Sequence, residues 1–343
     1  MSRPHAEPVP PPRRDRRRVL VAVGVALAVA VVAVVVVVVL LVRGSPAGPS
    51  GAEPTGAATP PTPSPTPTPS QAPEPEPGAP AVLTWAPPEL VDPETVELSA
   101  ENRSVTLEPD RDYVLELPDE PVEVRGGITV EGGRNVVLVG GEIRVGEEGE
   151  GNDRRALLLR DQTGTVHVEG LLLSGPGLAE GINLDQRLGA VVQLQNIRVE
   201  TVHGEEDGHH ADVLQTWAGP AELRIDRLSG RTTYQGFFLL PLQHGDQDAP
   251  RLFDLRNIDL VGEDGAGYLL WRDDADWPLA AREVWVAREG STGASGYVWD
   301  DGSRAAADWA QVRTGTPPDG PFVPEGSVGV GYTSPGYADG PPS

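Results

Sequence analysis

The sequence contains no cysteine and no lysine. Without cysteine the chain has no disulfide, no thiol nucleophile, no cysteine-ligated zinc and no iron–sulfur cluster. Without lysine it forms no Schiff base and has no phosphate-binding loop lysine. All 27 basic residues are therefore arginine, and 51 acidic residues give a formal net charge of −24. Because affinity for nucleic acid depends on basic side chains that neutralise phosphates, we expect no nucleic-acid partner.

The charge divides the chain into three parts. Residues 1–43 carry seven arginines against Glu7 and Asp15, whereas residues 44–80 carry only three charged residues, all glutamate. Residues 81–343 carry a net charge of −26. This division predicts three different environments for the three parts.

A long apolar run explains the basic N-terminus. Val19–Val42 contains 24 residues without a charge, and as a helix it would extend about 36 Å, enough to cross a hydrocarbon core of about 30 Å. A cleaved signal peptide is the alternative, but its apolar region has only about 7–15 residues. The arginines at 13–18 precede the run, so the positive-inside rule places residues 1–18 in the cytoplasm. We therefore predict an uncleaved, single-pass anchor in the cell membrane with the rest of the chain extracytoplasmic.

Residues 43–80 form a predicted linker. Thirteen prolines occur between Gly44 and Pro80, many of them alternating with Ser or Thr. Proline lacks a backbone donor and biases the preceding residue toward extended conformations, so this segment cannot form a packed structure. It is either a spacer that lifts the following domain off the membrane or a simple tether.

Short apolar strands repeat through the rest of the chain, with no stretch of helical 3.6-residue period. One strand type recurs every 25 to 31 residues. Its copies are Ala156–Asp161, Ile182–Arg187, Asp212–Trp217, Phe237–Leu242, Tyr268–Asp273 and Tyr297–Gly302. A second type follows the first four copies and ends in a turn position occupied by Gly170, Asn196, Arg227 and Asn257.

This period predicts an all-β solenoid in which each coil stacks in parallel on the next. A β-sandwich is the main alternative, but its turns recur at about 8–12 residues. In the solenoid the third residue of each copy should point inward. These residues are Leu158, Leu184, Leu214, Leu239, Leu270 and Trp299, all apolar. We assign the solenoid to residues 81–313 and a loose Gly/Pro-rich tail to residues 314–343, although Phe322, Val328, Val330 and Tyr332 could pack as a cap.

Two segments resemble the right-handed parallel β-helix, or pectate-lyase-like, superfamily. They are Gly133–Gly141 and His210–Gly219, the second with the sequence HADVLQTWAG. The resemblance extends over roughly residues 102–301. It implies a right-handed β-helix that binds polysaccharide in a groove over its first sheet. Strand alternation then places Gln215, Trp217, Phe238, Trp271 and Asp300 as candidate substrate-binding residues. Aromatic faces beside polar side chains suit sugars, although such residues can also lie under loops.

The densest polar cluster is His203–Asp212, with three histidines and four acids. From it we select His210 and Asp212, together with Asp185, as candidate catalytic residues. Asp212 occupies a strand position and needs a partner such as His210 or a cation. No zinc-binding spacing is present, and a solvated loop is the simpler interpretation of the cluster.

A second acidic cluster provides candidate metal ligands. Asp273, Asp274 and Asp276 could hold Ca²⁺ through carboxylate oxygens. The spacing does not match a calcium-binding loop, so we predict no obligatory cofactor.

Comparison with the superfamily's enzymes leaves catalysis open. The Trp-Ile-Asp-His block of pectate lyases is absent, and without lysine the Arg-Ile-Lys motif of polygalacturonase-like hydrolases cannot occur. The acidic body would also repel polyuronates unless a cation bridges them. Two functions remain: a polysaccharide-interacting surface protein, or a non-catalytic module that presents a solenoid face to a protein or cell-wall partner. Nothing in the sequence indicates an oligomeric state.

Overall fold

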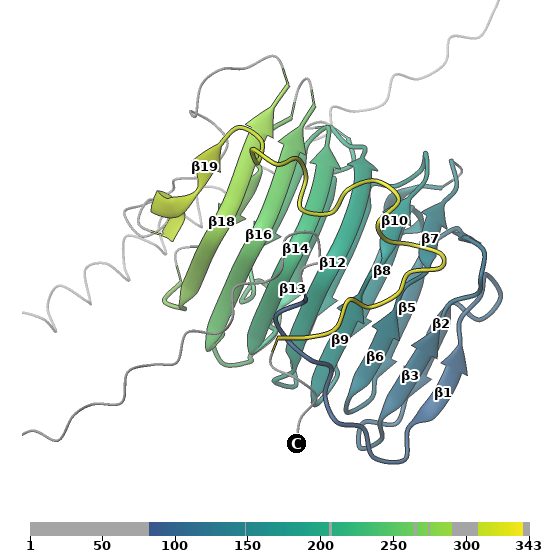
Figure 1. The fold of residues 1–343 in the computed structure, drawn as a ribbon. Helices are drawn as coiled ribbons and strands as arrows, with labels where there is room; N and C mark the ends of the chain where they lie inside the picture. Colours follow the sequence, from purple (N-terminus) through teal and green to yellow (C-terminus); the bar gives the residue numbers. More distant parts are fainter. Residues whose placement is uncertain are drawn as a thin grey trace, which may run out of the picture. The chain divides into compact units, whose positions relative to one another are not determined.

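The repeated strands form two parallel sheets in a computed structural model, which describes residues 82–147, 149–205, 208–263, 266–273, 275–289 and 308–338. Among these residues every strand pairing is parallel, and helix is limited to the 3₁₀ turns η1 (Gly151–Arg154) and η2 (Trp309–Gln311) apart from a single helical residue at Asp308. The two sheets lie back to back with the core between them (Figure 1).

One sheet has seven strands in the order β17-β15-β13-β11-β8-β5-β2. These strands are β2 (Ser104–Leu107), β5 (Ile128–Gly132), β8 (Arg155–Arg160), β11 (Glu180–Asp185), β13 (Asp212–Ala218), β15 (Gln235–Leu239) and β17 (Leu270–Arg272). Each predicted copy of the first strand type from Ala156 to Asp273 contributes to this sheet. The copy Tyr297–Gly302 lies outside the described residues.

The other sheet has twelve strands, and its main path runs β1-β3-β6-β9-β12-β14-β16-β18-β19. The strands of the first coils are β1 (Glu94–Glu97), β3 (Tyr113–Glu116), β4 (Val122–Val124), β6 (Val136–Val139), β7 (Glu142–Val145), β9 (Thr165–Glu169) and β10 (Leu172–Ser174). Those of the later coils are β12 (Val191–Val202), β14 (Glu222–Thr232), β16 (Leu252–Gly262), β18 (Leu279–Arg288) and β19 (Arg313–Thr314). The prediction of an all-β parallel solenoid is therefore confirmed.

The predicted turn positions form a column of left-handed residues that bends successive coils. Gly170 has φ 67°, and Asn196, Arg227 and Asn257 have φ between 51° and 60°. Glycine and asparagine adopt this conformation at lower cost than other residues. The same position recurs once more at Glu283, with φ 52°.

Asn257 provides a test of this column. Its amide also donates to Asp226 Oδ1 at 2.7 Å. Asn257→Ala should therefore lower the free energy of unfolding by about 1–2 kcal/mol, through left-handed strain and a lost hydrogen bond. Urea unfolding measures the effect, and Asn257→Gly, which relieves the strain, should lose less. Equal losses in the two variants would contradict the conformational part of the argument.

The strand register differs from the predicted alignment. The register pairs Leu158 with Asn183, and Leu184 with both Leu159 and Thr216. Leu158 therefore lies in an outward column, and Leu157, predicted to point outward, is fully buried in an inward one. The first inward column is Ile128, Leu157, Ile182, Leu214, Phe237 and Leu270. The predicted alignment was wrong because the loops between coils differ in length. Residues at the same position of two predicted copies therefore do not always pair with each other.

Arg272 closes the C-terminal end of the core. It continues the inward column of Leu184, Thr216 and Leu239, yet it is a charged residue with only 2% of its surface exposed. Its guanidinium stacks on the Trp277 ring, 3.7 Å from the centroid, and pairs with Asp308. It also donates to the backbone carbonyls of Asp273, Ala275 and Trp277. In the described part of the chain, a cation and aromatic rings, including buried Trp309, therefore cover this end of the core.

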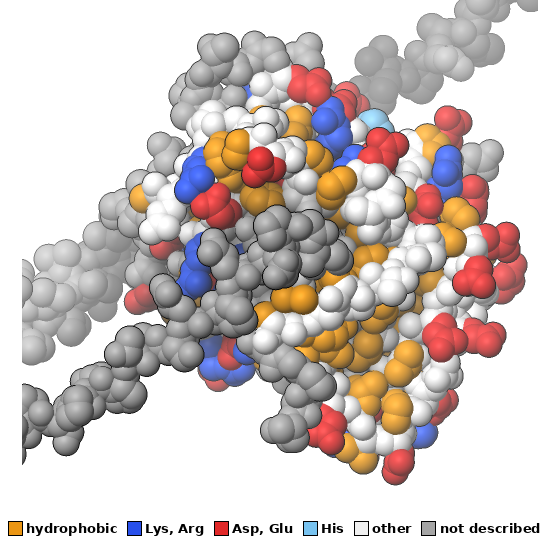
Figure 2. Space-filling view, in the orientation of Figure 1, with side chains coloured by type: hydrophobic (Ala, Val, Ile, Leu, Met, Phe, Trp, Pro, Cys, Tyr) orange, Lys and Arg blue, Asp and Glu red, His pale blue; other side chains and the backbone are white. Residues whose placement is uncertain are grey.

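At the N-terminal end of the solenoid, charged side chains protect the sheet edge from pairing with another strand. β1 is an edge strand with Glu94 and Glu97 at its two ends, and Figure 2 shows Asp and Glu side chains along this border of the molecule. Charged edge strands discourage pairing with a further chain. The acidic first coil therefore protects a sheet edge that has no covering element among the described residues.

Residues 315–338, which we call the C-terminal arm, run across the outer face of the twelve-stranded sheet (Figure 1). Val323 is fully buried, and its amide donates to Ser229 Oγ at 2.9 Å. The Gly329 amide donates to Gly170 O, and the Gly329 carbonyl accepts from the Gly141 amide. This segment is therefore packed along the solenoid side, in contrast to the loose tail that its composition suggested.

Candidate functional site

The outer face of the seven-stranded sheet carries a column of amide and aromatic side chains. The register aligns Asn183, Gln215, Phe238 and Trp271 on successive coils. Asn183 Nδ2 donates to Gln215 Oε1 at 3.1 Å. The rings of Phe238 and Trp271 meet edge to face with centroids 4.8 Å apart, and Tyr268 lies 6.0 Å from Trp271. The structure thus brings together three of the predicted substrate-binding residues, Gln215, Phe238 and Trp271.

Trp217 lies beside this column because of a β-bulge. Pairing passes from Leu184 with Thr216 directly to Asp185 with Ala218, which leaves Trp217 without a partner in the ladder. Its half-buried ring lies under the guanidinium of Arg155, 4.6 Å from the centroid. The bulge therefore places a second aromatic surface on the same sheet.

A row of polar residues precedes the column at the start of the strands. The strand register aligns Arg155 with Glu180, Glu180 with Asp212, and Asp212 with Gln235. Asp212 is 3% exposed and Glu180 is 8% exposed. Paired positions on neighbouring strands are about 4.8 Å apart, so the two carboxyl groups start from adjacent backbone positions.

The two carboxyl groups have opposite electrostatic environments. Burial, and secondarily the charge of Glu180, raises the pKa of Asp212 well above its usual range. Burial also opposes the ionisation of Glu180. However, the adjacent His209 ring and the nearby Arg155 guanidinium outweigh this and lower its pKa. Arg155 Nε lies 3.1 Å from Glu180 Oε2, and His209 Nε2 lies 3.4 Å from Oε1. At neutral pH this arrangement favours one ionised and one protonated carboxyl group.

Several buried polar atoms of the seven-stranded sheet have no hydrogen-bond partner among the described residues. They include the acceptors Asp212 Oδ1 and Asn183 Oδ1. Buried polar atoms are usually paired, so each is a candidate partner for a buried water molecule, or for a ligand hydroxyl once the side chains that cover it move. Three half-buried residues contact this part of the sheet: Gln215 bonds to Asn183, His209 lies beside Glu180, and Trp217 lies under Arg155.

The other predicted catalytic residues lie apart from the carboxyl pair. His210 is exposed and its ring stacks on Tyr234 at 5.0 Å, so the histidine that reaches the pair is His209. Asp185 forms ion pairs with Arg160 and Arg187, at 3.1 and 2.9 Å. Sequence reasoning missed Glu180 and Arg155. Correct strand alignment would have found Glu180, because it occupies the same coil position as Asp212.

Of the predicted metal ligands, the structure describes Asp273 and Asp276. Asp273 Oδ1 accepts from Trp277 Nε1 at 2.7 Å and from the Ala275 amide at 3.2 Å, so it organises a turn. Asp274 and Asp300 lie outside the described residues. Within the described ranges, no group of three or more acidic or histidine side chains is placed to hold a metal ion with Asp276 or elsewhere.

No protein-family model matches the chain, and neither a curated protein nor a solved structure matches it. In the described part of the chain, no helix has the length and apolarity needed to span a bilayer, and Val19–Val42 lies outside that part.

Proposed function

We propose that the protein is a membrane-tethered, extracytoplasmic right-handed β-helix of the pectate-lyase-like kind that binds polysaccharide on its seven-stranded sheet. The column Asn183–Gln215–Phe238–Trp271 carries this proposal. Sugars bind to proteins by stacking their C–H faces on aromatic rings while their hydroxyls bond to amides and carboxylates. Successive coils present these groups at a regular spacing, as a repeating polymer requires.

The net charge of the chain limits which class of polysaccharide is expected to bind. Residues 81–343 carry a net charge of −26, so an anionic polymer is repelled at long range. A neutral polysaccharide, or one bridged by cations, is therefore the expected ligand. The membrane tether rests on Val19–Val42 and the proline-rich linker that follows it.

Trp271→Ala tests the binding function. Removing this ring should weaken binding of the full-length protein to a neutral polysaccharide on a glycan array by at least about tenfold, or about 1.4 kcal/mol. Trp285→Ala is the matched control, because Trp285 is half-buried on the twelve-stranded sheet beside Arg313. Equal binding by wild type and Trp271→Ala to every glycan would exclude this face and favour the alternative function, a non-catalytic module for a protein or cell-wall partner.

The carboxyl pair supports a second function, hydrolysis of the bound polysaccharide. Retaining glycosidases use two carboxyl groups about 5–5.5 Å apart, one as acid and one as nucleophile, and Glu180 and Asp212 lie on adjacent strands. In this scheme protonated Asp212 gives its proton to the leaving oxygen as Glu180 attacks the anomeric carbon. Asp212 then takes a proton from the water that releases the sugar from Glu180. Since both groups are nearly buried, His209 must move aside to admit the substrate.

A further inference from the structure

The two ends of the described chain meet on the outer face of the twelve-stranded sheet. Residues 82–93, which we call the N-terminal arm, begin there before they reach β1. Leu83 pairs with Tyr337 in a parallel bridge. The Leu83 amide donates to Gly336 O at 2.8 Å, and the Ala338 amide donates to Leu83 O at 2.7 Å. We call the contact of residues 82–86 with residues 329–338 and the sheet below them the clasp.

The N-terminal arm is bound to the middle of the solenoid by polar side chains. Trp85 donates its amide to Gln195 Oε1 at 2.9 Å, and its carbonyl accepts from Gln195 Nε2 at 2.6 Å. Thr84 donates both its amide and its hydroxyl to Asp226 Oδ2, at 3.2 and 2.7 Å. Arg256 stacks over the Trp85 ring at 4.8 Å. These partners belong to β12, β14 and β16, so three consecutive coils hold the arm.

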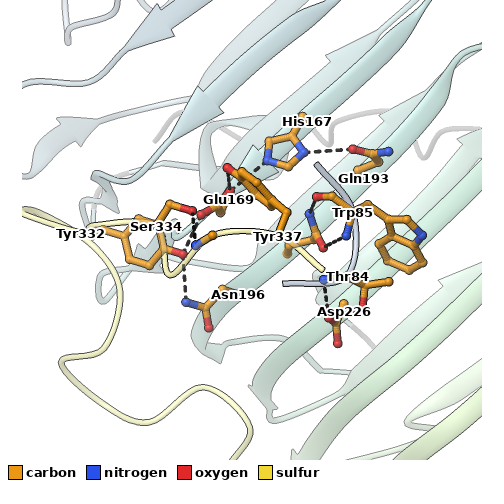
Figure 3. A network of polar contacts seen from close by, with 12 residues as sticks. Thr84, Trp85, His167, Glu169, Gln193, Asn196, Asp226, Tyr332, Ser334 and Tyr337 are labelled. Carbon is orange, nitrogen blue, oxygen red and sulfur yellow. Dashed lines mark hydrogen bonds and ion pairs between the residues drawn. The ribbon is translucent and has the colours of Figure 1, made fainter. Parts of the chain in front are cut away.

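The C-terminal arm is bound to the neighbouring coil through Glu169 of β9 (Figure 3). Tyr332 and Tyr337 donate their hydroxyls to its two oxygens at 2.8 and 2.6 Å, and His167 Nε2 lies 3.0 Å away. Glu169 is fully buried, and although burial opposes its ionisation, these hydrogen bonds lower its pKa. A buried carboxylate that accepts several bonds holds its donors strongly.

Along the described chain, the first contact with the solenoid is therefore the clasp, and the first coil comes after it. In the order β1-β3-β6-β9-β12, β1 lies four strands from β12, a distance of about 19 Å at 4.8 Å per strand. The N-terminal arm crosses this distance after the clasp and only then begins the coils. A solenoid whose chain started directly at β1 would expose its terminal repeat to peeling, since each repeat contacts only its neighbours.

We propose that the clasp is the attachment through which the solenoid resists pulling, so that tension on residue 82 acts on β9, β12, β14 and β16 and not on the first coil. The biological source of the tension is the proposed membrane tether acting against a bound polysaccharide, and the proposal rests on that function. The mechanical property itself depends on the contacts of the clasp, among them those of Leu83, Thr84, Trp85 and Tyr337, and not on polysaccharide binding.

Single-molecule stretching of the full-length protein tests the clasp. Because the chain has no cysteine, Leu188→Cys, at a site that is 54% exposed, provides a unique second attachment besides the N-terminus. The otherwise unchanged protein should show only the gradual stretching of the predicted linker, with no step before the coils unfold. The double variant Thr84→Val/Tyr337→Phe should show an additional step at lower force. This step should lengthen the chain by about 40 Å, the extended length of 12 residues, and release of the first coil should follow it.

The controls separate this proposal from the proposed function. Val91→Ala changes an exposed side chain of the same arm outside the clasp and should behave as the parent. Trp85→Ala provides a larger perturbation, and circular dichroism checks that each variant folds. An early 40 Å step in the parent protein would overturn the proposal. So would an unchanged force of the first step in both Thr84→Val/Tyr337→Phe and Trp85→Ala. Because the clasp is on the other sheet, clasp variants should keep their glycan-array binding, whereas Trp271→Ala should lose it and keep its unfolding force.

Discussion

Asp212→Asn should reduce the release of reducing ends from a bound neutral polysaccharide by about 10³-fold, within the 10²–10⁴-fold range of general acid catalysis. Asparagine preserves the size of the side chain but cannot supply a proton to the leaving oxygen. Binding on a glycan array should change little, since Gln215, Phe238 and Trp271 are intact. Asp185→Asn is the matched control, because Asp185 is equally buried on the same sheet but is ion-paired with Arg160 and Arg187.

The pH dependence gives a second measure of the same pair. Glu180 must be ionised, and its pKa is lowered, so the rate falls on the acid side only as pH drops through that lowered value. Asp212 must be protonated, and its pKa is raised, so the rate falls as pH rises through that raised value. Residual activity of Asp212→Asn should lose the alkaline limb. If the wild type binds polysaccharides but releases no reducing ends from any of them, hydrolysis is excluded and binding remains.

Arg272→Met should lower the free energy of unfolding by about 3–5 kcal/mol, the usual cost of removing one partner of a buried ion pair. Methionine keeps much of the length of the side chain, but Asp308 and the carbonyls of Ala275 and Trp277 lose their donor. The stacking on Trp277 is also lost. The midpoint of urea unfolding, followed by circular dichroism, measures the loss.

Arg251→Met is the control for the cap. Arg251 has 60% of its side chain exposed and pairs with Glu222 at 3.1 Å, so its loss should cost less than about 1 kcal/mol. A loss for Arg272→Met no larger than that of Arg251→Met would contradict the assignment of Arg272 as the end cap.

Local patterns in the sequence were sufficient to predict the coils. The turn residues Gly170, Asn196 and Asn257 have a strong preference for left-handed backbone, and their spacing indicates one turn per coil. The outward position of Gln215, Phe238 and Trp271 was also predictable, because it depends only on strand alternation within each copy.

Properties that depend on the pairing of coils were not predictable in this way. The inward residues Leu157, Ile182, Leu214 and Phe237 are separated by 25, 32 and 23 residues. Such unequal spacing hides the true register and with it the position of Glu180. The role of Arg272 was hidden for another reason, since a charged residue at an inward position depends on partners of the same end, among them Trp277 and Asp308, that the strand pattern does not reveal.

The clasp also limits how many coils this solenoid contains. Repeat proteins commonly gain or lose repeats, because each new unit needs only its two neighbours. Here the N-terminal arm joins Gln195 and Asp226 to β1 through a segment of fixed length, and the C-terminal arm joins Glu169 to Asp259 across β12 and β14. A coil inserted between these points would lengthen the sheet but neither arm. Duplication of an internal coil should therefore not be tolerated between β1 and β16, so the two arms fix the number of coils in that part of the solenoid.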